Sequence, residues 1–307
     1  MPRSLLLLAL VPLSACYPET RKDGGAGRPS ADVDTDTDTD TDSDTDTDTG
    51  SDTEPFIDYI TDYGATMVAI TAGTFAMGSA DYGPVHTVTL THDFWLGRTE
   101  VTQEEYARFG GSADTTPSYA SSCGSTCPVE QVSWEDAAAY ANALSASEGL
   151  EQCYTAAGGG LATVLERNPY MCAGYRLPTE GEWEYAARAG EPYDYAGSAT
   201  AGDVAWTYDN SGSTTHPVAR KSANAWGLHD MSGNVWEWNN DWYDTYGPDP
   251  VVDPLGAAAA LARVRRGGSW GNDEVNASVA SRAYNAPDVR NDIIGFRLAR
   301  SSSGALR

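Results

Sequence analysis

The sequence predicts a single α+β domain, rich in loops, over residues 56–307, and three observations lead to this fold class. Short segments with strand-like composition open this region. Three capping-box motifs further along the chain indicate three helices. Polar, glycine-bearing stretches separate these elements and are predicted to be loops. With 307 residues, of which 41% are hydrophobic, the chain can bury a substantial core.

The first 16 residues have the features of a secretory signal peptide. A positive charge at Arg3 precedes the apolar run Leu5–Leu13, which is too short to span a bilayer. The small residues before Cys16 resemble the lipobox of bacterial lipoproteins, in which this cysteine becomes the lipidated first residue. The resemblance implies a lipid anchor at Cys16, and Tyr17 after it implies sorting to the outer membrane. Ordinary secretion with cleavage nearby is the alternative.

Residues 17–55 are predicted to form a disordered acidic tether. Aspartate occupies every second position from Asp32 to Asp48, and threonine fills most positions between. Like charges at this density repel one another and keep a chain extended, and no apolar face is available for a strand to bury. A calcium-binding acidic repeat is the alternative, although the glycines that fold known repeat loops are missing.

The charge of the chain limits its partners. There are 44 acidic against 19 basic side chains, a net charge of −25, and residues 1–55 hold only 13 of the acids and 4 of the bases. The predicted domain is therefore acidic by itself. This argues against a nucleic acid partner and is compatible with bound cations, although an acidic surface also serves solubility.

The domain is predicted to open with strands. Met67–Ser79 has the composition of two short strands around a turn at Gly73, and Val85–His92 alternates strongly enough to form another strand. Later in the chain, the segments 206–212 and 215–218 are polar and are predicted to be loops.

Each predicted helix begins at a capping box, in which a Thr or Ser and an acidic residue three positions later bond each other's main-chain N–H groups. The second helix is an alanine-rich run to Leu144, and the third is expected to stop at Gly190. The three pairs are Thr102 with Glu105, Ser133 with Asp136, and Thr179 with Glu182.

The stretch 224–238 concentrates three tryptophans, two glycines and several oxygen donors. Asp230 and Glu237 could offer carboxylates, and Gly233 and Val235 main-chain carbonyls, from one bent loop. Hard cations such as calcium prefer all-oxygen surroundings, so the spacing predicts a calcium site formed by these four residues. The alternative is that the tryptophans are core aromatics and the glycines are turn residues.

Several motifs resemble the sulfatase-modifying factor family, whose founding member is the formylglycine-generating enzyme. Residues 227–238 match its Gly-Leu-x-Asp-Met-x-Gly-Asn-Val-Trp-Glu-Trp signature, and Arg176-Leu-Pro-Thr-Glu is among its most specific motifs. Arg265–Trp270 and Gly295–Arg297 resemble its closing strands. The resemblance spans residues 64–300 and implies the loop-rich α+β fold of that enzyme, which is related to C-type lectins.

The resemblance also implies particular sites. In the catalytic members a first calcium site lies near the loop at 206–218, where Asp203 and Asp209 are candidate ligands, but their spacing departs from the family pattern. The family's substrate cleft would be lined at Trp236, Ser269, Arg282 and Asn285.

The cysteines after Cys16 are four in number, in a chain bound for an oxidising compartment, so two disulfides are predicted. Three pairings exist. The pairs Cys123 with Cys127 and Cys153 with Cys172 are favoured, because each closes a loop within one segment. A Cys-x3-Cys metal site is the competing interpretation, and no nearby histidine completes it.

The metal chemistry of the family lacks its ligands here. The resemblance implies a reaction in which oxygen oxidises a substrate cysteine at copper(I), held by two thiolates after the Gly-Gly-Ser motif. Residues 271–281 contain no cysteine, so copper is not expected, because this soft metal requires sulfur ligands. Related sulfoxide synthases use iron bound by histidines, and no recognisable ligand pair exists among His86, His92, His216 and His229.

These inferences favour a non-catalytic binding or assembly module of the cell envelope. Its ligand would be a peptide, protein or glycan, its membrane contact the lipid anchor, and its cofactor calcium. The alternative is an oxidase acting on protein cysteines, with a metal held by residues that the sequence does not reveal.

Overall fold

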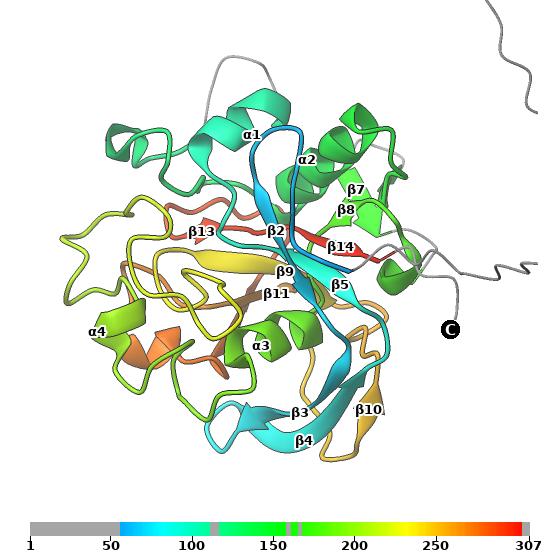
Figure 1. The fold of residues 1–307 in the computed structure, drawn as a ribbon, viewed down its shortest axis with the longest axis vertical. Helices are drawn as coiled ribbons and strands as arrows, with labels where there is room; N and C mark the ends of the chain where they lie inside the picture. The colour runs from blue at the N-terminus through cyan, green and yellow to red at the C-terminus, as the bar shows by residue number, and fades with distance from the viewer. Residues whose placement is uncertain (1–55, 111–116, 158–160, 165–167, 303–307) are drawn as a thin grey trace, which may run out of the picture. The chain divides into compact units, whose positions relative to one another are not determined.

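Most of the regular structure is strand, and a few short helices flank the central strands (Figure 1). The computed structural model describes residues 56–110, 117–157, 161–164 and 168–302, all within one compact unit, Glu54–Arg307. The predicted signal peptide, Cys16 and the tether lie outside the described residues. No helix in the described part of the chain is long and apolar enough to cross a lipid bilayer.

The three predicted helices are present, and each has its capping box. They are α1 (Gln103–Phe109), α2 (Trp134–Ser147) and α3 (Glu180–Arg188); a single turn, α4 (Ala201–Val204), and the 3₁₀ turns η1 (Ser121–Cys123), η2 (Pro169–Met171) and η3 (Glu274–Ala277) complete the set among described residues. The predicted stop of α3 needs a correction. Ala189, with a left-handed φ of 47°, caps this helix, and Gly190 follows the cap.

The first sheet has five strands and joins the beginning of the domain to its end. β14 pairs with β5 on one side and β8 on the other, so the last strand packs among the first ones. In sheet order the strands are β1 (Tyr59–Ile60), β2 (Thr66–Ile70), β5 (Phe94–Gly97), β14 (Ala299–Ser301) and β8 (Tyr175–Arg176).

A four-stranded sheet carries most of the sequence motifs, with β9 pairing antiparallel to β11 and parallel to β13. Its order is β12 (Arg282–Asn285), β11 (Arg263–Arg266), β9 (Trp236–Trp242) and β13 (Ile294–Gly295). The smaller sheets are β10 (Val251–Val252), β4 (Gly83–Leu90) and β3 (Gly73–Ser79), and the pair β6 (Tyr154–Ala157) and β7 (Leu161–Val164).

The predicted strands around Gly73 exist, but they do not form a hairpin. β2 belongs to the five-stranded sheet, whereas β3 pairs with β4. Gly73 is the first residue of β3, and a Cβ atom there would lie 2.2 Å from the Tyr185 hydroxyl oxygen of α3. Close packing against this helix, and not a turn, therefore favours glycine at the position, because any larger residue would displace the Tyr185 side chain.

Both favoured disulfides are confirmed. Cys123 is bonded to Cys127 and Cys153 to Cys172, with Cα–Cα distances of 6.0 and 5.8 Å. These bonds use all four cysteines of the described residues, so none of the four is a free thiolate ligand for a metal.

Two apolar clusters lie on either side of β9, which Figure 1 shows between α2 and α3. On the α2 side, Trp134 and Trp238 are fully buried, and on the α3 side Trp183 is fully buried. The tryptophans of the motif at 236–238 are thus core residues, and this reading does not exclude a site built on the same strand.

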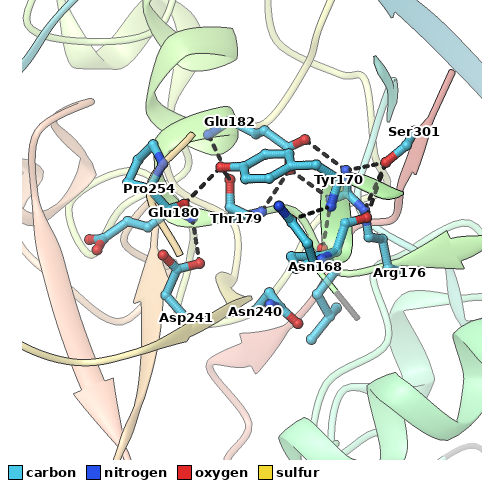
Figure 2. Close-up of polar contacts among 12 residues, drawn as sticks. Asn168, Tyr170, Arg176, Thr179, Glu180, Glu182, Asn240, Asp241, Pro254 and Ser301 are labelled. Atoms are coloured by element: carbon cyan, nitrogen blue, oxygen red, sulfur yellow. Dashed lines mark hydrogen bonds and ion pairs between the residues drawn. The ribbon is translucent and has the colours of Figure 1, made fainter. Parts of the chain in front are cut away.

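Ion pairs join α3 to both of the larger sheets. Three glutamates of α3 face the interior and are buried. Their charges are tolerated there because each glutamate has a guanidinium partner. Glu182 forms two 2.7 Å hydrogen bonds with Arg176, as Figure 2 shows. The other two pairs are Glu180 with Arg282, and Glu184 with Arg266.

Candidate binding and cation sites

The loop at 227–235 is bent by residues with left-handed backbones. Asp230, Gly233 and Asn234 have φ values of 56°, 83° and 59°. A Cβ atom at Gly233 would lie 2.5 Å from the main-chain oxygen of Trp206, so glycine is required there. This backbone turns the Asp230 side chain inward, where it is 3% exposed.

Glu237, a predicted calcium ligand, already has strong partners. Arg297 donates to both of its carboxylate oxygens at 2.6 Å, and Trp183 Nε1 donates to Oε2 at 2.7 Å. All three side chains are fully buried. Glu237 could reach a cation only by sharing an oxygen with Arg297 or Trp183.

Asp230 has one carboxylate oxygen that could accept a further hydrogen bond or bind a cation. The same is true of Glu100, which was not predicted from the sequence. Asp230 Oδ2 accepts the Ala219 N–H at 2.7 Å, whereas Oδ1 is buried without a hydrogen bond from the described residues. Glu100 is 1% exposed, and its Oε1 also lacks such a partner. Burial, and then the charge of Asp230, raise the pKa of Glu100 well above its usual range.

The acids Glu100, Asp230 and Glu237 interact electrostatically, and Arg297 is the cation beside them. Within the described residues no three His, Cys, Asp or Glu side chains converge closely enough to hold a metal ion. A cation here would therefore also need main-chain oxygens, which is the kind of ligand predicted for Gly233 and Val235. The orphaned Asp230 oxygen fits such a site.

The candidate residues of the first calcium site are not brought together with these acids. Asp203 lies on α4, where its Oδ2 accepts a hydrogen bond from the Ser198 hydroxyl at 2.9 Å. Asp209 is exposed in the loop that follows. The spacing of these two residues differs from the family pattern for this calcium site, and their positions in the structure do not make up for the difference.

Two predicted cleft residues, Trp236 and Ser269, meet at Asn272. Trp236 Nε1 and the Ser269 hydroxyl both donate to Asn272 Oδ1, at 2.7 and 2.6 Å. Trp236 and Ser269 are themselves buried. They therefore lie beneath the surface of the predicted cleft and do not line it. Asn272, which sequence reasoning missed, is half-buried above them.

Arg265 is the unpaired cation of this surface. Its guanidinium lies 4.6 Å from the centre of the Trp236 ring, and its Nε and Nη1 are buried without acceptors from the described residues. Burial lowers its pKa to about 10, so it remains charged at neutral pH. Asn285 Oδ1 is also without a partner, and strand alternation places Asn285 and Arg265 on the same face.

Arg282 does not belong to this surface, which corrects the predicted cleft. In the ladder, Arg282 lies opposite Arg266, and Arg266 lies opposite Glu237. Side chains alternate along a strand, so Arg282 projects from the face opposite to that of Trp236. It donates to both carboxylate oxygens of Glu180, at 2.8 and 2.7 Å.

The surface offers binding groups but no activated nucleophile. The Ser269 hydroxyl donates to an amide oxygen and not to a base. The four histidines are held separately: His86 and His229 by main-chain oxygens, His92 against Asp253 and His216 against the Trp206 ring. The sequence signal for Arg265 is its place directly before the Arg-Gly-Gly-Ser motif, and the signal for Glu100 is its place two residues before the capping residue Thr102.

Comparison with known proteins places these features in a family context. A family model described as "Sulfatase-modifying factor enzyme 1-like domain" matches residues 60–302. The chaperone protein LppX of Paenibacillus barcinonensis is 32% identical over 235 residues, which cover 66% of this chain and 78% of that protein.

The formylglycine-generating enzyme of Streptomyces coelicolor is 35% identical over 195 residues, which cover 57% of this chain and 53% of the enzyme, so the match spans about half of the enzyme's length. Among solved structures, Treponema denticola variable protein 1 matches with a TM-score of 0.70 and 35% identity, over 80% of this chain and 98% of that chain. The predicted fold class is confirmed.

Proposed function

Since this chain belongs to the sulfatase-modifying factor family, we propose that it uses the family fold as a non-catalytic binding module. The binding surface is formed by Arg265, Asn272 and Asn285 over the buried Trp236 and Ser269. Its ligand presents a carboxylate or carbonyl oxygen, as peptides, proteins and many glycans do, because the free groups of Arg265 are hydrogen-bond donors.

One observation carries the proposal: the half-buried Arg265, whose buried Nε and Nη1 have no acceptor among the described residues, stands where the family places its cleft. A buried unsatisfied donor costs about 1–3 kcal/mol, and a ligand acceptor would remove that cost. The state of the cysteines supports a role without copper chemistry. All four in the described residues are in disulfides, and the loop after Ser269 contains none.

The module would act in the cell envelope, anchored by lipid at Cys16 and held away from the membrane by the acidic segment 17–55. Two disulfides are typical of proteins in oxidising compartments, and the apolar run before Cys16 supports export. The relative named as a chaperone protein supports a role in binding or assembling other proteins.

Binding through Arg265 can be measured by selecting peptides from a displayed random library on the immobilised full chain. We expect enriched peptides to share an acidic side chain or a free carboxyl terminus. Arg265→Gln should weaken their binding at least about tenfold, the loss of one charge-assisted hydrogen bond. Arg220→Gln is the matched control, since Arg220 is an exposed arginine elsewhere on the domain and should leave the affinity unchanged.

Equal affinity for the Arg265→Gln protein would contradict the binding surface. The alternative function, an oxidase acting on protein cysteines, is tested by incubating a cysteine-containing sulfatase peptide with the protein, copper(I) and oxygen. We expect no aldehyde product, and its formation at a catalytic rate would establish the oxidase instead.

We further propose that calcium stabilises the 227–235 loop. Asp230 would supply a carboxylate oxygen, Gly233 and Val235 main-chain carbonyls, and Glu237 an oxygen shared with its present partners. Support comes from the orphaned Asp230 oxygen and from three interacting acids beside one arginine. A divalent cation would offset the excess negative charge.

Thermal melting with calcium and with a chelator checks this proposal. At a calcium concentration one hundred times the dissociation constant, a native-only site adds about 2.7 kcal/mol of stability. We expect a corresponding rise in melting temperature that disappears in Asp230→Asn and persists in Asp209→Asn. A melting temperature that is indifferent to calcium would count against the site.

A further inference from the structure

A cavity of about 550 Å³ lies on the opposite face of the four-stranded sheet from the Arg265 surface, and the proposed function does not use it. The first turn of α3, the end of β9 and the loop 244–257 enclose it. Much of its wall is apolar. The apolar lining consists of Met77, Trp242, Val251, Val252, Pro254, Leu255 and Ala257.

Two of the charged groups around this cavity are already paired. Glu180 receives two hydrogen bonds from the Arg282 guanidinium, which also donates to the main-chain oxygen of Asp244 at 2.7 Å. Asp253 accepts the N–H and the hydroxyl of Thr91, at 2.8 and 2.6 Å, and lies 3.4 Å from His92 Nδ1. Asp244, also at the cavity, is exposed to solvent, where its charge is hydrated.

Asp241 differs from these acids because it is buried and forms no ion pair among the described residues, although the charge of Arg263 acts on it from a longer distance. It is 3% exposed, and Oδ2 accepts the Glu180 N–H at 2.8 Å, as Figure 2 shows. No contact among the described residues supplies a hydrogen bond to Oδ1. Burial, followed by the charge of Glu180, raises the pKa of Asp241 to about 8.

We propose that this cavity binds a primary ammonium group on a short alkyl chain, with the ammonium at the Asp241 carboxylate and the chain against the apolar wall. One unpaired carboxylate calls for one positive charge, which favours an organic monocation over a divalent metal. The volume and the apolar lining suit an alkyl chain, since burying methylene groups against an apolar wall removes them from water. A lysine side chain of a peptide and a free small amine share this chemistry.

The probe is butylammonium chloride, titrated into the full chain and followed by the NMR shifts of the backbone amides around 241–257. We expect saturable binding at millimolar concentration and at least tenfold weaker binding of 1-butanol, which has a similar length without the charge. Nα-acetyl-lysine methylamide tests the peptide source. Binding as tight as butylammonium indicates a lysine side chain, and weaker binding indicates a free amine.

The pH dependence gives a second test on the unmodified protein. Butylammonium stays charged below pH 9, like the lysine side chain, whereas the pKa of Asp241 is about 8, raised by burial and by the charges of Glu180 and Glu182 against the opposing charge of Arg263. A larger share of Asp241 is therefore ionised at pH 8 than at pH 6, and binding should tighten by at least about tenfold over this interval. An affinity that does not rise over this interval overturns the proposal.

Variants complete the test. Asp241→Asn keeps an oxygen for the Glu180 N–H but removes the charge, and it should abolish butylammonium binding. Asp249→Asn, in the exposed part of the same loop, should leave it unchanged. Equal binding by the Asp241→Asn protein overturns the proposal. Arg265→Gln should retain ammonium binding, so failure of the proposed function and failure of this site are distinguishable.

Discussion

Replacing Arg297 with methionine is expected to lower the free energy of unfolding by about 3–5 kcal/mol, the usual cost of leaving one member of a buried ion pair without its partner. Arg297 is fully buried and donates to both oxygens of Glu237 and to the carbonyls of Gly97 and His229. Without it, Glu237 would face Glu100 and Asp230 with no compensating charge. Urea unfolding in the presence of a chelator measures the difference.

Two further variants test whether the loss comes from the orphaned charge. The double variant Glu237→Gln, Arg297→Met should recover much of the stability, because it removes both charges and Trp183 can still donate to the glutamine oxygen. Arg290→Met is the control for an exposed pair: Arg290 contacts Asp136 at 2.6 Å with about half of its side chain in solvent. It should cost at most about 1 kcal/mol. An Arg297→Met cost no larger than that of the control would contradict the argument.

Asp241→Asn is expected to stabilise the protein increasingly as the pH rises. In the folded state the pKa of Asp241 is raised to about 8, against about 3.9 in the unfolded chain. The folded state therefore holds this proton more tightly, and the associated stability is present below pH 4 and is lost as the pH rises through 8. Each pH unit in that window costs about 1.4 kcal/mol, or on the order of 4 kcal/mol by pH 7.

The asparagine variant has no such proton to lose, so its advantage over the wild type should be near zero at pH 4, several kcal/mol at pH 8, and constant above. Denaturant unfolding at pH 5, 6, 7 and 8 measures the two curves. Asp249→Asn should run parallel to the wild type, because Asp249 is exposed. A stability difference for Asp241→Asn that is independent of pH would refute the assignment of an uncompensated buried acid.

Local interactions explain why much of the fold could be predicted. A capping box involves a side chain and the main chain three residues away, so Thr102, Ser133 and Thr179 mark their helices whatever surrounds them. The turn at Gly73 was also predicted from the local pattern, and it is wrong, because the two strands beside it pair in different sheets. Which sheet a strand joins depends on partners that are remote in the sequence, here β4 and β5.

The candidate sites show the same difference between what local motifs predict and what depends on residues remote in the sequence. Trp236 and Ser269 could be named from motifs, and the structure joins them through Asn272. The family resemblance predicts Arg282 in the same cleft, but strand alternation turns it to the other face. Calcium at Asp230 and its neighbours stays a prediction, to which the structure adds the orphaned oxygens of Asp230 and Glu100.

The sequence by itself determined the family, the α+β class, the helix starts and the two disulfides, because motifs, caps and short loops are properties of neighbouring residues. Only the tertiary structure decided which charges meet and which are left alone. Glu237 and Arg297 are 60 residues apart and form a buried pair, whereas neither Arg265 nor Asp241 forms an ion pair with another described residue. Burial makes these long-range pairings important, because a charge that is removed from water is stable only when an opposite charge, a hydrogen-bond partner or a bound ligand lies beside it.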